Sequence, residues 1–277
     1  MRTESELRAL VNLLADEDEK IAAVAWSELQ MAGDRAVPLL TDATGDADPL
    51  RRERAVRLLS ERSVSEAEER WRRFATRPER LIDLEEGCIL LAEVTGEAVD
   101  GKAIQDRLDV ISGMVRAHMP GAGGLGALTE VLFDNLGFRG GDFAEPESHL
   151  LPGVLWRRSG IPISLATVFL LVARRLDLPV AGVAMPGHYL TRYETVEGPV
   201  FIDCYTRGRL YEQGALVGLL EGHGLKFTDS YLAPCTDRFT LFRMMNNLER
   251  CWRDLEEDGL ADRVARWRSY LGLERNR

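Results

Sequence analysis

The chain has 277 residues and a formal net charge of −10, from 35 Lys and Arg against 45 Asp and Glu. Hydrophobic residues make up 45% and charged residues 29%, which is typical of a globular chain with one large domain or two modest ones. The acidic balance and the lack of a basic stripe argue against nucleic-acid binding. No segment reaches the ~18 apolar residues of a membrane helix, and the N-terminus lacks a signal pattern, so we expect no membrane contact and a cytoplasmic location.

Cysteine and histidine residues are too scattered to suggest a metal or redox centre. No CxxC pair occurs among the four cysteines, Cys88, Cys204, Cys235 and Cys251. Three histidines lie in loop-like contexts without the spacing of metal ligands, namely His118, His149 and His223. The sequence therefore predicts reduced thiols, no metal and no cofactor.

Residues 1–63 are predicted to form helices with an internal repeat. Acidic turns recur at 16–18 and 46–48, a spacing typical of helix-hairpin repeats. An Asp turn followed by an Arg on the next helix (Arg51, Arg52 or Arg54) resembles a HEAT-like repeat. An ordinary helical cap without repeat ancestry explains the pattern equally well.

Helical patterns continue from 64 to 119 and again over 128–136. The glycine-rich segment 120–126 between them is predicted to be a flexible connector, because no strand precedes it and no Gly-Lys-Ser/Thr follows. A helix that starts at Pro162 is apolar nearly all round as far as Ala173, so we expect it to be central and buried.

Short strand-like segments follow at 180–185, 188–193 and 200–205, and their close spacing predicts an antiparallel sheet. From Thr240 the pattern is helical to the end of the chain. The predicted fold class is α+β, with a buried helix packed on a small antiparallel sheet inside a predominantly helical envelope.

The order of motifs in the centre is specific. A helix entered through Gly160-Ile161-Pro162 is followed by Pro186-Gly187-His188 at a strand start, and then by Asp203 on the next strand. This order resembles the transglutaminase-like branch of the papain-type fold. With the blocks 160–165 and 186–190, it is similar to the SirB-type transglutaminase-like family of bacteria over residues 64–230.

In that fold, the resemblance implies, a Cys at the start of the buried helix attacks a carbonyl, a His acts as base and an Asp orients the His. Here His188 and Asp203 match the base and its partner, while Pro162 stands where the Cys is expected. Cys204 also departs from the family, which has Pro after the Asp. The tail opens like the family's tetratricopeptide segment at 245–248 and continues for only one helical hairpin.

Two residues could replace the missing nucleophile. Ser164 lies in the first turn of the same helix, but two residues rotate a helix by about 200°, which points Ser164 away from the Cys position. A helix-start hydroxyl that bonds backbone N–H groups is the alternative role for Ser164. Cys204 follows Asp203 on a strand and is expected to face the opposite side, as a buried structural thiol.

We expect a direct hydrogen bond between His188 and Asp203. Pro162, Cys204, Arg192 and Arg209 are candidate pocket residues, and the two arginines could instead be solvated surface side chains. Arginines outnumber acidic residues in 150–215, so an acidic peptide or a carboxylate is the expected ligand.

Three regions are expected: a HEAT-like region at 1–63, a transglutaminase-like domain at 64–235 and a truncated tetratricopeptide-like hairpin at 236–277. The first functional hypothesis is a non-catalytic module that binds a protein or peptide, and the resemblance implies a regulatory role for it. The alternative is an acyl-transfer enzyme (an amidase, protease or transglutaminase) that uses His188 and Asp203 with Ser164 or Cys204 as nucleophile.

Overall fold

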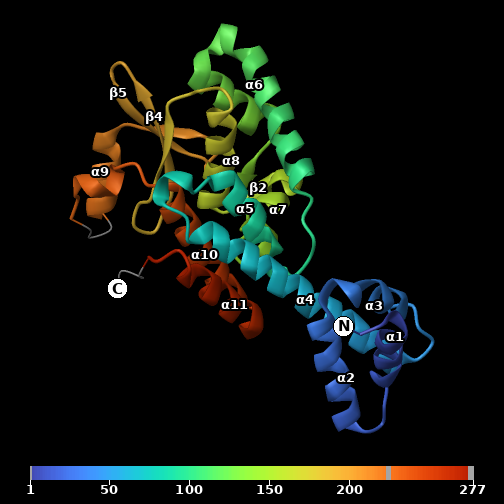
Figure 1. Ribbon diagram of the computed structural model, residues 1–277. Helices are drawn as coiled ribbons and strands as arrows, with labels where there is room; N and C mark the ends of the chain where they lie inside the picture. Colours follow the sequence, from blue (N-terminus) through green and yellow to red (C-terminus); the bar gives the residue numbers. More distant parts are fainter. Residues whose placement is uncertain (1, 223–225, 274–277) are drawn as a thin grey trace. The chain divides into compact units, whose positions relative to one another are not determined.

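The computed structural model describes residues 2–222 and 226–273. The chain divides into two compact units, one of Met1–Glu69 with Thr95–Ala98, and one of Arg70–Val94 with Val99–Arg277. Helix α4 (Pro49–Ala75) begins in the first unit and ends in the second (Figure 1). No described helix combines the length and hydrophobicity that crossing a bilayer requires.

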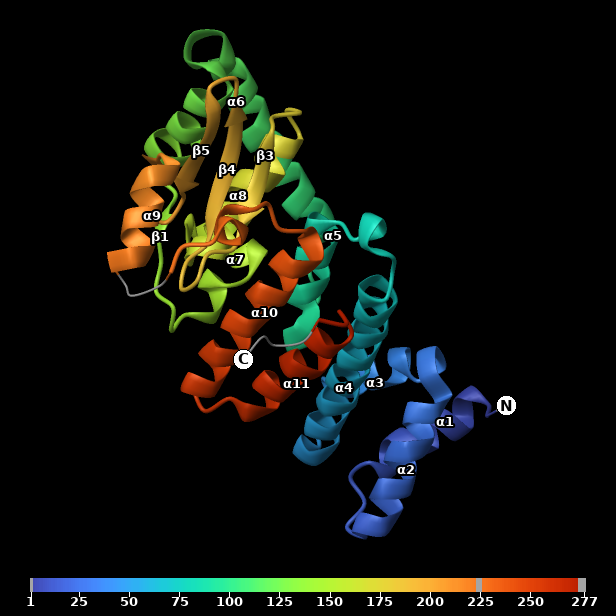
Figure 2. The same ribbon diagram turned by 90° about the vertical axis from the view of Figure 1, so that its left-hand side faces the viewer.

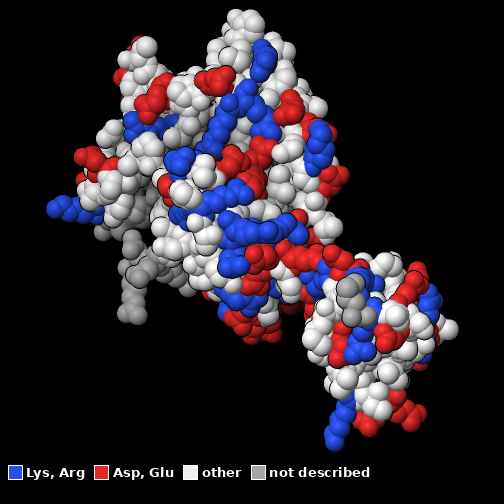
Figure 3. All heavy atoms as spheres, viewed as in Figure 1, with Lys and Arg blue, Asp and Glu red and all other residues white. Residues whose placement is uncertain are grey.

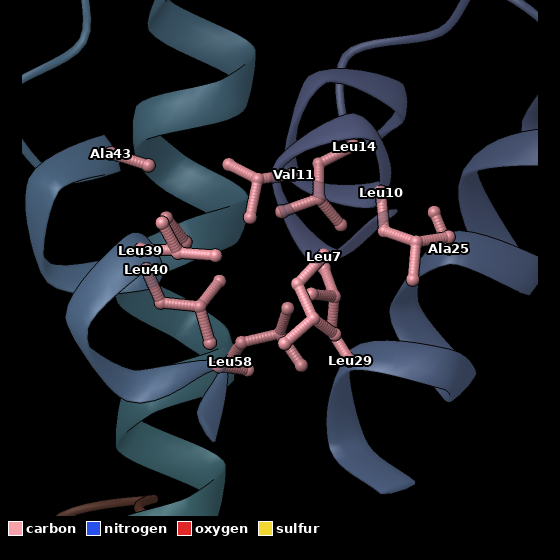
Figure 4. Close-up of a cluster of buried hydrophobic side chains, with 12 residues drawn as sticks. Leu7, Leu10, Val11, Leu14, Ala25, Leu29, Leu39, Leu40, Ala43 and Leu58 are labelled. Carbon is pink, nitrogen blue, oxygen red and sulfur yellow. The ribbon is translucent and has the colours of Figure 1, made fainter. Parts of the chain in front are cut away.

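The first unit is entirely helical. Its elements are α1 (Glu4–Leu13), α2 (Glu19–Ala32), the short η1 (Gly33–Arg35), α3 (Val37–Ala43) and the first part of α4. Leucine and alanine side chains from all four α-helices meet in one apolar core, which Figure 4 shows at Leu7, Leu29, Leu40 and Leu58. Removing this apolar surface from water is what stabilises so small a unit.

The two acidic turns of the first unit are built alike. The N–H of Asp18 donates to Asp16 Oδ1 at 2.9 Å, and the N–H of Asp48 donates to Asp46 Oδ1 at the same distance. Asp18 and Asp48 then accept from the N–H two positions further on, each at 2.9 Å, and so cap the helix that follows. The two turns therefore share the same pattern of aspartate-to-backbone hydrogen bonds.

The second unit combines helices with two small sheets. Its main helices are α5 (Leu84–Ala92), α6 (Gly101–Thr129), α7 (Leu151–Arg157), α8 (Pro162–Arg174), α9 (Gln213–Gly222), α10 (Asp237–Asp254) and α11 (Asp258–Ser269). Shorter helical turns are η2 (Glu79–Leu81), η3 (Glu93–Thr95), η4 (Glu130–Asn135), η5 (Pro146–Ser148) and η6 (Asp229–Leu232). The fold is α+β, as predicted.

A four-stranded antiparallel sheet has the order β3 (Val180–Val183), β4 (Leu190–Thr195), β5 (Gly198–Asp203), β6 (Arg209–Tyr211). Thr191 pairs with Ile202, so the start of β4 lies beside the end of β5. A second sheet joins β1 (Arg139–Gly140) and β2 (Ser159–Gly160) in parallel.

Helix α8 is the centre of the second unit, since every residue from Pro162 to Ala173 is buried. It contacts β3 and β4 of the sheet and also α6, α7 and α10 (Figure 2). Pro162 occupies its first turn, where the missing N–H leaves no hydrogen bond unmade. Pro162 therefore suits the start of this buried helix.

The prediction that residues 120–126 form a loop is wrong, because the backbone of this segment is helical except at one residue. Helix α6 continues through this segment, and only Gly123 (φ +70°, ψ 175°) leaves the helical region. Figure 1 shows the chain direction changing sharply there. Gly123 provides the left-handed φ at which two helical segments can join. The predicted helix 128–136 continues from α6 as a wider π-helical turn over Glu130–Asn135.

Arg238 in the first turn of α10 binds the chain where α4 and α11 end. Its guanidinium donates to the carbonyl oxygens of Ala75 (2.7 Å), Arg77 (2.5 Å) and Leu271 (2.9 Å) and pairs with Glu79 (2.7 Å). Those carbonyls lie at or beyond helix C-termini, where intrahelical donors run out. One side chain thus fixes the start of α10 against the ends of α4 and α11.

Asp237, which precedes Arg238 in the chain, links α10 to the central helix α8. It accepts two hydrogen bonds from Arg174 at the C-terminus of α8 (2.8 and 2.5 Å) and one from the N–H of Leu84 (3.1 Å). Arg238 and Asp237 together set the position of α10 relative to α8.

Candidate functional site

His188 and Asp203 lie in contact at one edge of the sheet. His188 is in the loop that enters β4, and Asp203 is the last residue of β5. His188 Nε2 lies 3.0 Å from Asp203 Oδ2. The antiparallel register of β4 and β5 makes the start of one strand and the end of the other neighbours. The structure therefore brings together the two residues between which the sequence predicts a hydrogen bond.

Asp203 is held as a carboxylate. Its other oxygen, Oδ1, accepts the backbone N–H groups of Tyr205 (2.9 Å) and Thr206 (3.2 Å). Burial raises the pKa of Asp203, but the hydrogen bonds from His188 and Thr206 outweigh burial, so the pKa lies below its ordinary value. An ionised carboxylate can only accept a hydrogen bond, so His188 Nε2 carries the proton that it donates to Asp203 Oδ2. The other ring nitrogen of His188, Nδ1, is then the one that can interact with a ligand.

A pocket of about 730 Å³ lies beside this pair. One wall is the first turn of α8, through Pro162 and Ile163, and next to it is the loop Gly187–Tyr189 that carries His188. The side chain of His188 is 30% exposed, so solvent or a ligand reaches it. The helix start and the histidine of the predicted site thus border the same space.

Helix α10 forms a second wall, which was not predicted from the sequence. The pocket is lined from one face of the helix by residues at helical spacing, with Asn246 and Asn247 adjacent: Phe239, Arg243, Asn246, Asn247 and Arg250. Phe242, Cys251 and Asp254 also border it. The polar stripe beside the apolar residues of 240–255 is the signal that could have indicated this wall.

His149 and Phe143 complete the pocket from the loop before α7. His149 Nε2 lies 2.9 Å from the carbonyl oxygen of Phe143, so Nε2 carries the proton and Nδ1 is an acceptor. Nδ1 is buried and has no hydrogen-bond partner. Burial lowers the pKa of His149, so the neutral ring is favoured.

This depressed pKa predicts how stability varies with pH. The unfolded chain takes up a proton on His149 near pH ~6.5, whereas the folded chain does so only at lower pH, so the wild type loses stability as the pH falls below ~6.5. His149→Gln keeps a donor for Phe143 and does not titrate. We expect the difference in the free energy of unfolding, His149→Gln minus wild type, to be more positive at pH 5 than at pH 7.5. Chemical denaturation of both proteins at each pH measures this difference. A difference that is the same at both pH values would contradict a buried neutral ring.

The two proposed replacement nucleophiles do not line the pocket. Ser164 is buried on α8, and its hydroxyl donates to the carbonyl of His149 at 3.2 Å; the backbone N–H bond considered for it is not the one it makes. Cys204 is fully buried and lies 3.9 Å from the Thr191 hydroxyl. The placement of Cys204 as a pocket residue is therefore wrong, because its side chain lies in the core directly after the end of β5.

Arg192 and Arg209 do not line the pocket either, which corrects that prediction. Arg192 pairs with Glu194 at 2.6 Å and donates to the carbonyl of Leu232. Arg209 is exposed and lies over the ring of Tyr211, 4.9 Å from its centroid. Arg209 pairs with Asp203 in the register of β5 and β6, but neither arginine borders the pocket.

The arginine count of 150–215 does not make a basic cleft, because most of these side chains have acidic partners. Arg157 pairs with Glu145, Arg174 with Asp237 and Arg175 with Glu85. Figure 3 shows basic and acidic groups interspersed on the visible face. The cations that reach the pocket are instead Arg243 and Arg250 of α10.

Within the described residues, no group of three or more His, Cys, Asp or Glu side chains is arranged to hold a metal ion. His118 bonds the carbonyl of Met114, and His223 lies outside the described residues. All four cysteines are free.

A buried helix that starts at a pocket, a strand-entry histidine and an aspartate on the next strand make up the candidate site. The profile of the Transglutaminase-like superfamily matches residues 102–246, and the chain belongs to that superfamily. The match ends within α10, so it includes the pocket residues Arg243 and Asn246.

Similar proteins include bacterial and animal sequences. A UPF0162 protein of Xylella fastidiosa is 33% identical over 149 residues, which cover 51% of this chain and 53% of that protein. A UPF0162 protein of Pseudomonas aeruginosa is 38% identical over 108 residues, 38% of this chain and 39% of its own. F-box only protein 21 of Mus musculus is 36% identical over 95 residues, 31% of this chain and 15% of that protein. The matches span about half or less of these relatives, and no solved structure matches the chain significantly.

Proposed function

We propose that this chain is a non-catalytic, SirB-type member of the superfamily that binds a protein segment or peptide in the pocket beside His188. The observation that carries the proposal is the side chain at the start of α8. Pro162 borders the pocket at the helix end where the family resemblance expects a cysteine, and proline offers no nucleophile. The histidine and aspartate persist as part of a binding surface.

The other potential nucleophiles support this proposal. Ser164 and Cys204 are buried away from the pocket. Cys251 borders the pocket, but burial and then the nearby carboxylates, Asp254 first, raise its pKa to about 11, so it stays protonated at neutral pH. Tyr189 is buried, and its hydroxyl is bonded to Thr240 at 2.7 Å.

The alternative function is acyl transfer with His188 as base. The His188–Asp203 contact favours it, since this pair has the arrangement of a general base and its orienting carboxylate. It requires Ser164 or Cys204 to leave its buried position and reach His188. Binding without catalysis requires no such rearrangement.

The flanking regions fit a binding protein. We propose that residues 1–63 are a pair of HEAT-like repeats, supported by the identical Asp turns at 16–18 and 46–48, and that 236–277 is a shortened tetratricopeptide-like hairpin. Helical repeats of these kinds commonly contact proteins. The occurrence of a similar segment within F-box only protein 21 supports a domain, here 64–235, that serves as a module in larger chains.

A displayed peptide library tests the proposal. The wild-type chain is expected to enrich peptides that Asn247→Trp no longer binds, because Asn247 borders the pocket and an indole there fills it. Val196→Trp is the matched control, since Val196 is fully exposed at the tip of the β4–β5 hairpin. If the wild type enriches no peptide, or if Asn247→Trp binds the same peptides as Val196→Trp, the proposal fails.

A further inference from the structure

We propose that the pocket binds a carboxylate of its peptide ligand between Arg243 and Arg250 of α10. This inference rests on the proposed function and specifies its ligand. The carboxylate is either the free C-terminus of a chain or an Asp or Glu side chain.

Arg243 is a half-buried cation without an anion. Its guanidinium makes one hydrogen bond, a long one of 3.4 Å to the carbonyl of Met185, and no carboxylate among the described residues forms an ion pair with it. Arg174, at the C-terminus of α8, has a bidentate carboxylate partner instead. An unpaired charge in a buried position costs free energy. A ligand anion would supply the ion-pair partner that Arg243 lacks in the folded chain. Burial also lowers the pKa of Arg243, in line with an uncompensated charge.

Arg250 is the second arginine of α10 that borders the pocket. It lies two helical turns beyond Arg243 on the same face of α10, and it is exposed and has no ion pair within the described part of the chain. Asp254 borders the pocket too, about one turn beyond Arg250 and three turns, about 16 Å of helix rise, beyond Arg243, so it offsets the charge of Arg250 and not that of Arg243. The end of the pocket nearest Arg243 therefore has a net positive charge.

The remaining wall suits an apolar side chain. Phe239 and Phe242 stack with ring centroids 6.2 Å apart, and both border the pocket. Phe143 borders it from the opposite loop. An acidic group next to a large apolar side chain is therefore the ligand composition that these walls favour.

Three short peptides distinguish the sources of the carboxylate. The probes are acetyl-Ala-Ala-Leu-Phe-Ala with a free carboxylate, the same peptide as its C-terminal amide, and acetyl-Ala-Glu-Leu-Phe-Ala amide. Isothermal titration calorimetry measures the Kd of each for wild type, Arg243→Gln, and Arg253→Gln. Arg253 is the matched control because it lies on the same helix, pairs with Asp258 and does not border the pocket.

At least one of the two acidic peptides is expected to bind wild type with a Kd about tenfold or more below that of the neutral amide. This difference in affinity is what one charge-assisted hydrogen bond contributes. Arg243→Gln is expected to abolish that preference and Arg253→Gln to keep it. The acidic peptide that binds identifies the source. Equal binding of all three, a preference that survives Arg243→Gln, or no binding at all would overturn the carboxylate site. Equal binding that Asn247→Trp blocks would leave the peptide-binding pocket itself standing.

Discussion

Arg238→Ala is expected to lower the free energy of unfolding by about 3 kcal/mol or more. The guanidinium of Arg238 donates to three main-chain carbonyls and pairs with Glu79, while its side chain is only 12% exposed. Its removal leaves the carbonyls of Ala75, Arg77 and Leu271 without their charged donor. Urea denaturation followed by circular dichroism measures the loss.

Arg80→Ala provides the comparison for this effect. Arg80 is exposed and lies in η2, near the same segment of chain, so its loss is expected to change stability by less than about 0.5 kcal/mol. Arg238→Lys keeps the positive charge, but an ammonium group cannot reach all the acceptors that the planar guanidinium reaches. This variant should therefore recover only part of the lost stability. If Arg238→Ala were as stable as Arg80→Ala, Arg238 would not be what holds α10 against the ends of α4 and α11.

Pro162→Cys is expected to create the most reactive thiol in the chain. Residue 162 lies in the first turn of α8 and borders the pocket with His188. A helix N-terminus and a nearby imidazole both lower a thiol pKa, often to between ~3.5 and ~7.5. At pH 6.5 we expect iodoacetamide to alkylate Cys at this position about tenfold or more faster than any native cysteine, as measured by mass spectrometry of the labelled peptides.

The double variant Pro162→Cys with His188→Ala separates the two causes. Loss of the imidazole is expected to slow alkylation severalfold, because the helix N-terminus alone then stabilises the thiolate. If the single and double variants reacted at the same slow rate, residue 162 would not occupy the position of a nucleophile.

The centre of the fold was predictable because its signals are local. The apolar run from Pro162 to Ala173 indicated a buried helix, and the short strand segments indicated an antiparallel sheet. The order of Gly-X-Pro, Gly-His and Asp also allowed the His188–Asp203 contact to be anticipated. Motif order constrains topology, and topology brought these two residues together.

The wall formed by α10 could not be predicted in this way. Arg243 and Arg250 lie far beyond His188 in the sequence, and only tertiary packing through Asp237 and Arg238 brings them to the pocket. A count of charges along 150–215 pointed instead to arginines that ion pairs neutralise, such as Arg174 and Arg175. Charge composition says how many cations a segment has and not which of them find a carboxylate.

The absence of nucleophilic catalysis is the central claim, and adduct mapping on the native chain tests it most directly. Wild type and His188→Ala are treated in parallel with iodoacetamide and with a fluorophosphonate, and modified residues are located by mass spectrometry. We expect the two chains to give the same adducts, with none on a residue that borders the pocket. A pocket adduct, or one on Ser164 or Cys204, that forms on wild type and disappears in His188→Ala would contradict the claim and establish the acyl-transfer alternative.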